Sequence, residues 1–175
     1  MHSEYEAVVY DLDGTLVRLA VDWGAVAAAV VDVFEANGDD VSGMDLWTMM
    51  DRASGTDLEA DVEAAVSEFE IDGARESERL PTAAELPRSE PVGVCSLNCA
   101  EACHVALETH GLTEAVDAVV GRDSVDGQKP DPKPLLATIE QLDAAPERTL
   151  FVGDSESDEE TATAAGTDFR YVSGR

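Results

Sequence analysis

A short apolar run that ends in two aspartates is the feature that most constrains how this chain can fold. Residues Ala7 to Tyr10 are apolar and lead directly into Asp11-Leu12-Asp13-Gly14-Thr15. An apolar run of this length, closed by a turn signal, is typical of a strand buried on both faces of a parallel sheet. The two carboxylates then lie where the strand ends, which is where open α/β sheets bind ligands.

Two carboxylates held this close repel each other unless a cation lies between them or one of them keeps a proton. Either arrangement is chemically useful, because a metal-held Asp11 can act as a nucleophile and Asp13 can hold or deliver a proton. The alternative is an acidic corner between strand and loop that has no function, which is common in an acidic protein. The position at a strand end favours the functional interpretation.

Strand and helix patterns alternate over the second half of the chain. Strands are predicted at 91–96, 116–120, 150–152 and 169–172, and helices at 99–110, at 132–142 and in a segment that ends at Ala165. Strands that alternate with helices at this spacing require right-handed crossovers and a parallel sheet. The sequence therefore predicts an α/β fold, a Rossmann-like parallel five-stranded sheet with helices on both faces.

A long helical block separates the first two strands. Helices are predicted at 22–37, with Asp22 as the N-cap, at 42–53 and at 57–69, and no strand is predicted between residues 20 and 85. The block is too long for one crossover connection, so we interpret residues 20–88 as a small inserted helical cap. Residues 1–19 and 89–175 then form the core. We expect the cap to close over the strand ends as a lid, the alternative being a rigid subdomain.

The charge of the chain is extreme. Eleven Lys+Arg face 38 Asp+Glu, for a formal net charge of −27, and only two of the basic residues are lysines. Such a surface makes nucleic acid and anionic membranes poor partners. Acid excess with few lysines and few aromatics predicts a halophilic protein adapted to high intracellular salt. Because 44% of the residues are hydrophobic, a core can form, and we interpret the charge as a surface property rather than as disorder.

The sequence also bears on the cellular location of the protein. The sequence contains no signal peptide and no 18-residue apolar run, so we expect a cytoplasmic protein, either a monomer or a homodimer.

Cys95, Cys99 and Cys103 lie near His104, but a zinc site needs four ligands in a tighter pattern. Cys99 and Cys103 more simply fill one buried helix face.

Further polar groups are predicted at the same edge of the sheet. Ser96 ends the second strand, and its hydroxyl could join the backbone N–H groups of Leu97 and the next residues in a phosphate cradle, although it could equally be a turn cap. Lys129 lies in a proline-stiffened loop, 127–134, that would present its ammonium to a phosphoryl oxygen. Lys133 is expected on the surface.

The stretch Gly153-Asp154-Ser155-Glu156-Ser157-Asp158 follows the fourth strand. Asp154 can reach the same metal ion as Asp11. Asp158, four residues further on, can hold Lys129 or a metal-bound water. The glutamates in and after this stretch are expected to be solvated.

In chain order, Asp-x-Asp-Gly-Thr, a serine at the second strand end, Lys-Pro in a loop and Gly-Asp-x-x-x-Asp resemble the haloacid dehalogenase-like (HAD) hydrolase superfamily. The resemblance covers residues 5–20 and 90–172. The helical insertion resembles the cap of the phosphoglycolate phosphatase-like and β-phosphoglucomutase-like branch. The resemblance implies a magnesium-dependent phosphomonoesterase, which hydrolyses small phosphorylated metabolites through an aspartyl-phosphate.

The resemblance also implies a role for each matching residue. Asp11 would be the nucleophile and Asp13 the general acid and base, with Lys129 as a third catalytic residue. The Mg²⁺ cofactor would be held by Asp11, the backbone carbonyl of Asp13 and Asp154. Many relatives have Asn directly after the serine, where this chain has Leu97, so we assign no side-chain role to Asn98. The substrate-binding residues implied are Thr15, Ser96, Leu97 and Lys129, with Asp158 in a supporting role.

Other functions were weighed against the same residues. Dehalogenation is disfavoured because that branch has no acid at the position of Asp13. A receiver domain would carry its phosphorylated aspartate on the third strand and would have no helical insertion. A sugar-phosphate mutase of the same superfamily and a catalytically idle phosphate-binding protein stay open as alternatives.

Overall fold

A five-stranded sheet is the centre of the fold. The computed structural model describes residues 4–173, and within them the sheet has the order β5-β4-β1-β6-β7 with every pair parallel. The predicted α/β fold is therefore confirmed, with the strand that carries the aspartates at its centre. The strands are β1 (Ala7–Tyr10), β4 (Val92–Cys95), β5 (Ala118–Val120), β6 (Thr149–Gly153) and β7 (Asp168–Tyr171).

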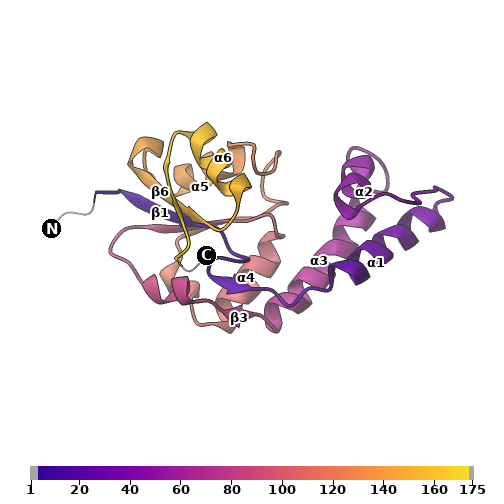
Figure 1. Cartoon of the computed structure of the whole chain (residues 1–175), viewed down its shortest axis with the longest axis horizontal. Coiled ribbons are helices and arrows are strands. Elements are labelled where there is room, and N and C mark those ends of the chain that lie inside the picture. Colours follow the sequence, from indigo (N-terminus) through magenta and orange to yellow (C-terminus); the bar gives the residue numbers. More distant parts are fainter. Residues whose placement is uncertain (1–3, 174–175) are drawn as a thin grey trace.

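Helices cover both faces of this sheet, which explains why β1 is apolar throughout. Successive side chains of a strand point to opposite faces. Val8 and Tyr10 join the hydrophobic cluster under α4 (Ala100–Thr109), whereas Ala7 and Val9 join the cluster under α5 (Lys133–Gln141) and α6 (Glu156–Ala165). Figure 1 shows α4 on one side of the sheet and α5 and α6 on the other. Cys99 and Cys103 are buried together in the α4 cluster, as expected.

The three helices α1 (Trp23–Ala36), α2 (Leu46–Ala53) and α3 (Glu59–Arg75) form a lobe beside the sheet (Figure 1). They enclose a hydrophobic cluster of their own, which includes Val30, Met49 and Val66. The predicted N-cap of the first helix is confirmed, because Asp22 Oδ1 accepts a hydrogen bond from Ala25 N at 3.1 Å. A separate core of this kind supports the proposal that residues 20–88 are an inserted cap.

Helix α3 differs from its predicted extent, because it runs to Arg75 instead of ending at Phe69. Its last turns lie on the α/β core, where Ala74 and Ile71 pack into the α4 cluster. The local signal for helix is weak there because of Gly73, and tertiary packing overrides it. Helix α2 also starts later than expected, after Asp45, whose Oδ1 accepts from Thr48 N at 2.9 Å.

The expectation of no strand between residues 20 and 85 is wrong. The chain leaves the core through β2 (Val17–Arg18) and returns through β3 (Glu78–Arg79), and the two strands pair in an antiparallel ribbon. Leu80 N also donates to Leu16 O at 3.0 Å. Strands this short show no alternation of apolar and polar residues, so the sequence carries no signal for them.

Short 3₁₀ turns complete the fold in residues 4–173, at η1 (Pro81–Glu85), η2 (Thr113–Ala115) and η3 (Pro146–Arg148). None of the helices in this range is long and apolar enough to cross a membrane.

Candidate active site

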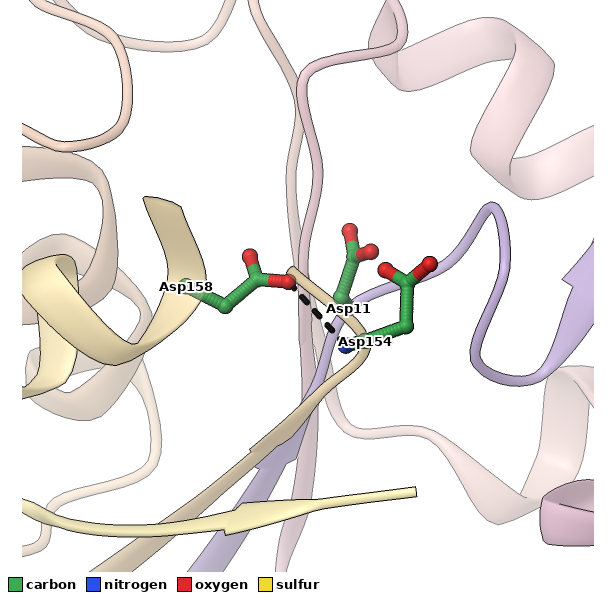
Figure 2. A group of neighbouring side chains, drawn as sticks. All are labelled: Asp11, Asp154 and Asp158. Carbon is green, nitrogen blue, oxygen red and sulfur yellow. Dashed lines mark hydrogen bonds between the residues drawn. The ribbon is translucent and has the colours of Figure 1, made fainter. Parts of the chain in front are cut away.

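The acids predicted at strand ends meet at one edge of the sheet. Asp11 follows β1 and Asp154 follows β6, and these two strands are parallel neighbours. Asp11 N continues the ladder by donating to Val152 O at 2.9 Å. Figure 2 shows the Asp11 and Asp154 carboxylates side by side, with Asp158 reaching toward them from α6. Side-chain oxygens of these three aspartates lie within 4.8 Å of one another.

Gly14 makes this close approach possible. Its φ is +87°, a conformation that L side chains rarely adopt. A Cβ at this position would also collide with the Asp154 carboxylate. The glycine of the Asp-x-Asp-Gly-Thr motif is therefore required by the space that Asp154 occupies.

Lys129 provides the positive charge of the site. Its Nζ donates to Asp11 Oδ1 at 3.0 Å, to Asp158 Oδ1 at 2.5 Å and to Cys95 O at 3.3 Å. The side chain is buried, which by itself would lower the pKa of the ammonium, but the two carboxylates outweigh burial and raise that pKa above its ordinary value. Lys129 is thus held as a cation against Asp11, where the sequence predicted it.

Asp158 holds Lys129 in place, as predicted. While its Oδ1 accepts from Lys129, its Oδ2 accepts from Ser155 Oγ at 2.8 Å and from Asp154 N at 3.2 Å. With Ser155 it forms a capping box at the start of α6, because Asp158 N in turn donates to Ser155 Oγ. Both oxygens of Asp158 are therefore already engaged.

The remaining carboxylates fit a divalent cation. Mg²⁺ prefers hard oxygen ligands, and Asp11 and Asp154 present them side by side (Figure 2). Burial raises the pKa of Asp11 to about 7, an increase that Lys129 partly offsets. A cation between Asp11 and Asp154 would favour the ionised form of both and remove their mutual repulsion.

Asp13 lies in a different environment from Asp11. Its Oδ1 accepts from Leu19 N at 2.9 Å, and its side chain is not part of the cluster formed by Asp11, Asp154 and Asp158. Burial raises the pKa of Asp13, which favours the protonated form that a general acid needs. Asp11 and Asp13 therefore lie in different environments, which suits the different roles of nucleophile and general acid predicted for them.

The loop after β4 contains Ser96, which the sequence predicts to join a phosphate cradle. Ser96 is buried, and its Oγ donates to Asn98 Oδ1 and accepts from Asn98 N, both at 3.1 Å. The sequence led us to assign Asn98 no side-chain role, but in the structure its amide has a local one, since it also donates to Glu70 Oε1 at 3.1 Å. The Asn98 side chain therefore shapes the loop in which Ser96 lies.

Two residues that sequence reasoning missed hold this loop against the cap. Glu70 of α3 is fully buried, and its carboxylate accepts from Cys99 N at 3.0 Å and from Arg122 at 2.7 and 3.0 Å. Arg122 also donates to Glu63 and to Leu97 O. The available signal was weak. Glu63 and Glu70 are seven residues apart and lie on one helix face, and Arg122 comes two residues after the end of β5 in a chain with few cations.

A pocket of about 210 Å³ opens at this edge of the sheet. It is also lined by Trp23 and Trp47 from the cap. Thr15 lies elsewhere: it is buried, does not line the pocket, and its Oγ1 has no hydrogen-bond partner among the described residues. A substrate-binding role for Thr15 stays a prediction. The predicted residues that the pocket brings together are Asp11, Asp13, Ser96, Leu97, Lys129 and Asp154.

Solved structures share this fold. The structure of CbbY from Rhodobacter sphaeroides in complex with phosphate aligns with a TM-score of 0.72 over 98% of this chain and 87% of that one, at 22% identity. A HAD-superfamily hydrolase from Geobacter sulfurreducens aligns with a TM-score of 0.62 over 94% and 88% of the two chains, at 26% identity. The architecture is therefore that of the HAD hydrolases.

Sequence comparison gives the same family. The phosphoglycolate phosphatase of Cereibacter sphaeroides (strain ATCC 17029 / ATH 2.4.9) is 33% identical over 181 residues, which cover 93% of this chain and 82% of the relative. The phosphoglycolate phosphatase of Escherichia coli (strain K12) is 43% identical over a shorter stretch, 34% of this chain and 24% of the relative. These relatives support a phosphatase. Since the family model for haloacid dehalogenase-like hydrolases matches residues 8–172, the chain belongs to the haloacid dehalogenase-like hydrolase family.

Proposed function

We propose that this enzyme is a magnesium-dependent phosphomonoesterase that hydrolyses small phosphorylated metabolites through an aspartyl-phosphate. The observation that carries the proposal is the hydrogen bond of 3.0 Å from Lys129 Nζ to Asp11 Oδ1, beside the Asp154 carboxylate in the same pocket. Phosphoryl transfer depends mainly on positioning and charge neutralisation, and these groups supply both. Phosphoglycolate phosphatase relatives support the same reaction type.

In the proposed reaction an Asp11 oxygen attacks phosphorus, and the bond from phosphorus to the substrate oxygen breaks. Asp13 gives its proton to the departing alcohol. A water molecule, which loses a proton to Asp13, then attacks the phosphorus of the aspartyl-phosphate, so that orthophosphate leaves and Asp11 is restored. Lys129 and Ser96 neutralise and orient the phosphoryl oxygens. The magnesium ion, held by Asp11, Asp154 and the Asp13 carbonyl, would neutralise the charge that builds up on the transferring group.

Two alternatives stay open. A sugar-phosphate mutase would use the same Asp11 and Asp13 but would return the phosphoryl group to a retained intermediate. A catalytically idle phosphate-binding protein would bind the ester without turnover. Incubation with p-nitrophenyl phosphate and Mg²⁺ in molar potassium chloride separates these cases. We expect steady release of orthophosphate that EDTA stops and added Mg²⁺ restores, whereas binding without release would contradict the proposal.

Asp154→Asn is expected to raise the Mg²⁺ concentration that gives half-maximal activity by about 10- to 100-fold and to lower kcat, because an amide is a poorer ligand for a hard cation. The measurement is a Mg²⁺ titration of the rate. Asp126→Asn, which removes an exposed carboxylate outside the pocket, serves as the matched control. An Mg²⁺ titration that is the same for Asp154→Asn and the native protein would exclude Asp154 as a ligand.

The acidity supports a second element of the proposal, a halophilic enzyme, which we also propose to be cytoplasmic. A net charge of −27 on 175 residues repels itself in dilute buffer, and the Debye length falls from about 10 Å at 0.1 M to about 3 Å at 1 M salt. Tm is therefore expected to rise by about 5 °C or more between dilute buffer and 2 M potassium chloride. A Tm that stays flat over this range would show that the acidity has another cause.

A further inference from the structure

Two tryptophans of the cap face the pocket that holds Asp11 and Lys129. Trp23 is the first residue of α1 and Trp47 the second residue of α2, and both line the pocket. Their ring centroids lie 6.2 Å apart with an interplanar angle of 41°. Both helices belong to the lobe beside the sheet in Figure 1. The cap therefore contributes an aromatic wall, Trp23 and Trp47, to the pocket that also contains the groups that would hold a phosphoryl.

Packing within the cap does not account for these side chains. Trp23 is 38% exposed and Trp47 is 50% exposed, and neither belongs to the hydrophobic cluster that holds the three cap helices together. Large exposed apolar side chains that gather at a cavity commonly mark a surface that binds a ligand. Indole rings offer a wide apolar face for stacking at a small entropic cost.

The charges around the pocket are unfavourable for a second anionic group. Its acidic lining residues outnumber its basic ones, and Lys129 is the one lysine or arginine among the described residues that line it. The Lys129 ammonium already contacts Asp11 and Asp158. The acidic residues that line the pocket are Asp11, Asp13, Glu70 and Asp154, of which Glu70 is paired with Arg122.

The arginines of the cap are engaged elsewhere. Arg52 pairs with Asp39, Arg75 with Asp72 and Arg88 with Glu90, and Arg79 donates to Ala83 O. None of these four arginines is among the residues that line the pocket. A neighbouring cavity of about 650 Å³, which shares Trp47, contains acidic residues but no lysine or arginine among its described lining residues.

We infer that the substrate is a phosphate monoester of an uncharged alcohol that presents a ring face, such as a sugar or a nucleoside. This inference rests on the proposed function and adds the substrate class. The phosphoryl group would lie against Lys129 and beside Asp11 and Asp154, which would hold a cation. A carboxylate on the leaving group would instead lie against indole rings and further carboxylates, where a desolvated anion without a partner is strongly disfavoured. A ring would gain contact area with Trp23 and Trp47.

The test compares kcat/KM of the full-length enzyme for four esters and one acyl phosphate in molar potassium chloride with Mg²⁺. Glucose 6-phosphate and adenosine 5′-monophosphate represent the two sources of a ring, p-nitrophenyl phosphate a generic aryl ring and 2-phosphoglycolate the carboxylate-bearing class. Acetyl phosphate, which has neither a ring nor a second charge, is the reference. We expect at least one of the sugar and nucleoside esters to exceed 2-phosphoglycolate by about tenfold or more.

Variants at the aromatic wall provide the second readout. In Trp47→Ala the kcat/KM ratio of the best ring-bearing ester to acetyl phosphate should fall about 5- to 20-fold, and Trp47→Phe should recover part of the loss. Trp47→Arg should raise the relative kcat/KM for 2-phosphoglycolate. Leu136→Ala, which truncates an exposed apolar side chain of α5 outside the pocket, is the matched control and should leave the ratios unchanged.

The outcomes separate the inference from the proposed function. If acetyl phosphate is hydrolysed but 2-phosphoglycolate is preferred to every ring-bearing ester, or the Trp47 variants leave the ratio unchanged, the inference is wrong and the phosphatase assignment stands. If the native enzyme hydrolyses none of the five compounds faster than Asp11→Asn does, the proposed function itself is wrong and the inference fails with it.

Discussion

Asp11→Asn is expected to lower kcat by about 10⁴-fold or more while the fold is kept, because an amide cannot attack phosphorus in place of a carboxylate. The substitution is nearly isosteric, and the amide oxygen can still accept the hydrogen bond that Lys129 Nζ gives to Asp11 Oδ1. Turnover of p-nitrophenyl phosphate is the measurement for activity, and circular dichroism together with Tm reports on the fold.

The control for this substitution is Glu156→Gln, the same change from carboxylate to amide at an exposed position in the first turn of α6. It should leave the rate within about twofold of the native value, since surface substitutions away from a site have small effects. Retention of more than a few per cent of native activity in Asp11→Asn would contradict a nucleophilic role for Asp11.

Arg122→Met is expected to destabilise the protein by about 3–5 kcal/mol, because it removes the cation from a buried ion pair and leaves the charge of Glu70 behind. Glu70 is fully buried, and the side chain of Arg122 is only 2% exposed. The carboxylates of Glu70 and Glu63 raise the pKa of Arg122 further above its ordinary value, although burial opposes them. Denaturant unfolding in molar potassium chloride measures the loss.

A surface ion pair provides the comparison. Arg148 contacts Glu6 at 2.8 Å, but their side chains are 54% and 45% exposed, so Arg148→Met should cost no more than about 1 kcal/mol. Adding Glu70→Gln to Arg122→Met should recover part of the lost stability, because the buried charge is then gone. Equal effects of Arg122→Met and Arg148→Met would show that the buried pair does not hold the cap helix to the core.

The same ion pair makes the core dependent on the cap. Glu63 and Glu70 lie on α3, so deletion of residues 20–88 would leave Arg122 without both of its carboxylate partners and would free the loop that carries Ser96. Point substitutions at Trp23 and Trp47 avoid this damage. Closure of the cap as a lid stays a prediction.

The central strand, the parallel sheet and the acids at its edge could all be predicted from the sequence. These depend on local patterns: an apolar run as long as a strand, turn residues directly after it, and strands that alternate with helices. Because the carboxyl ends of parallel strands meet at one edge, the convergence of Asp11 and Asp154 followed from the topology alone. The pairing of Lys129 with Asp11 and Asp158 agreed with the motif pattern.

The contacts that join the cap to the core, and the cap residues that line the pocket, could be identified only from the tertiary structure. The end of α3 is helical because its residues pack on α4, the β2–β3 ribbon forms because two connecting segments run together, and Glu70 meets Arg122 across 52 residues of sequence. Trp23 and Trp47 likewise line the pocket only because of where the cap lies beside the sheet. Contacts between residues distant in sequence produce no periodic pattern and no characteristic spacing in the chain. The residues that we infer to determine substrate specificity could therefore be identified only from the fold.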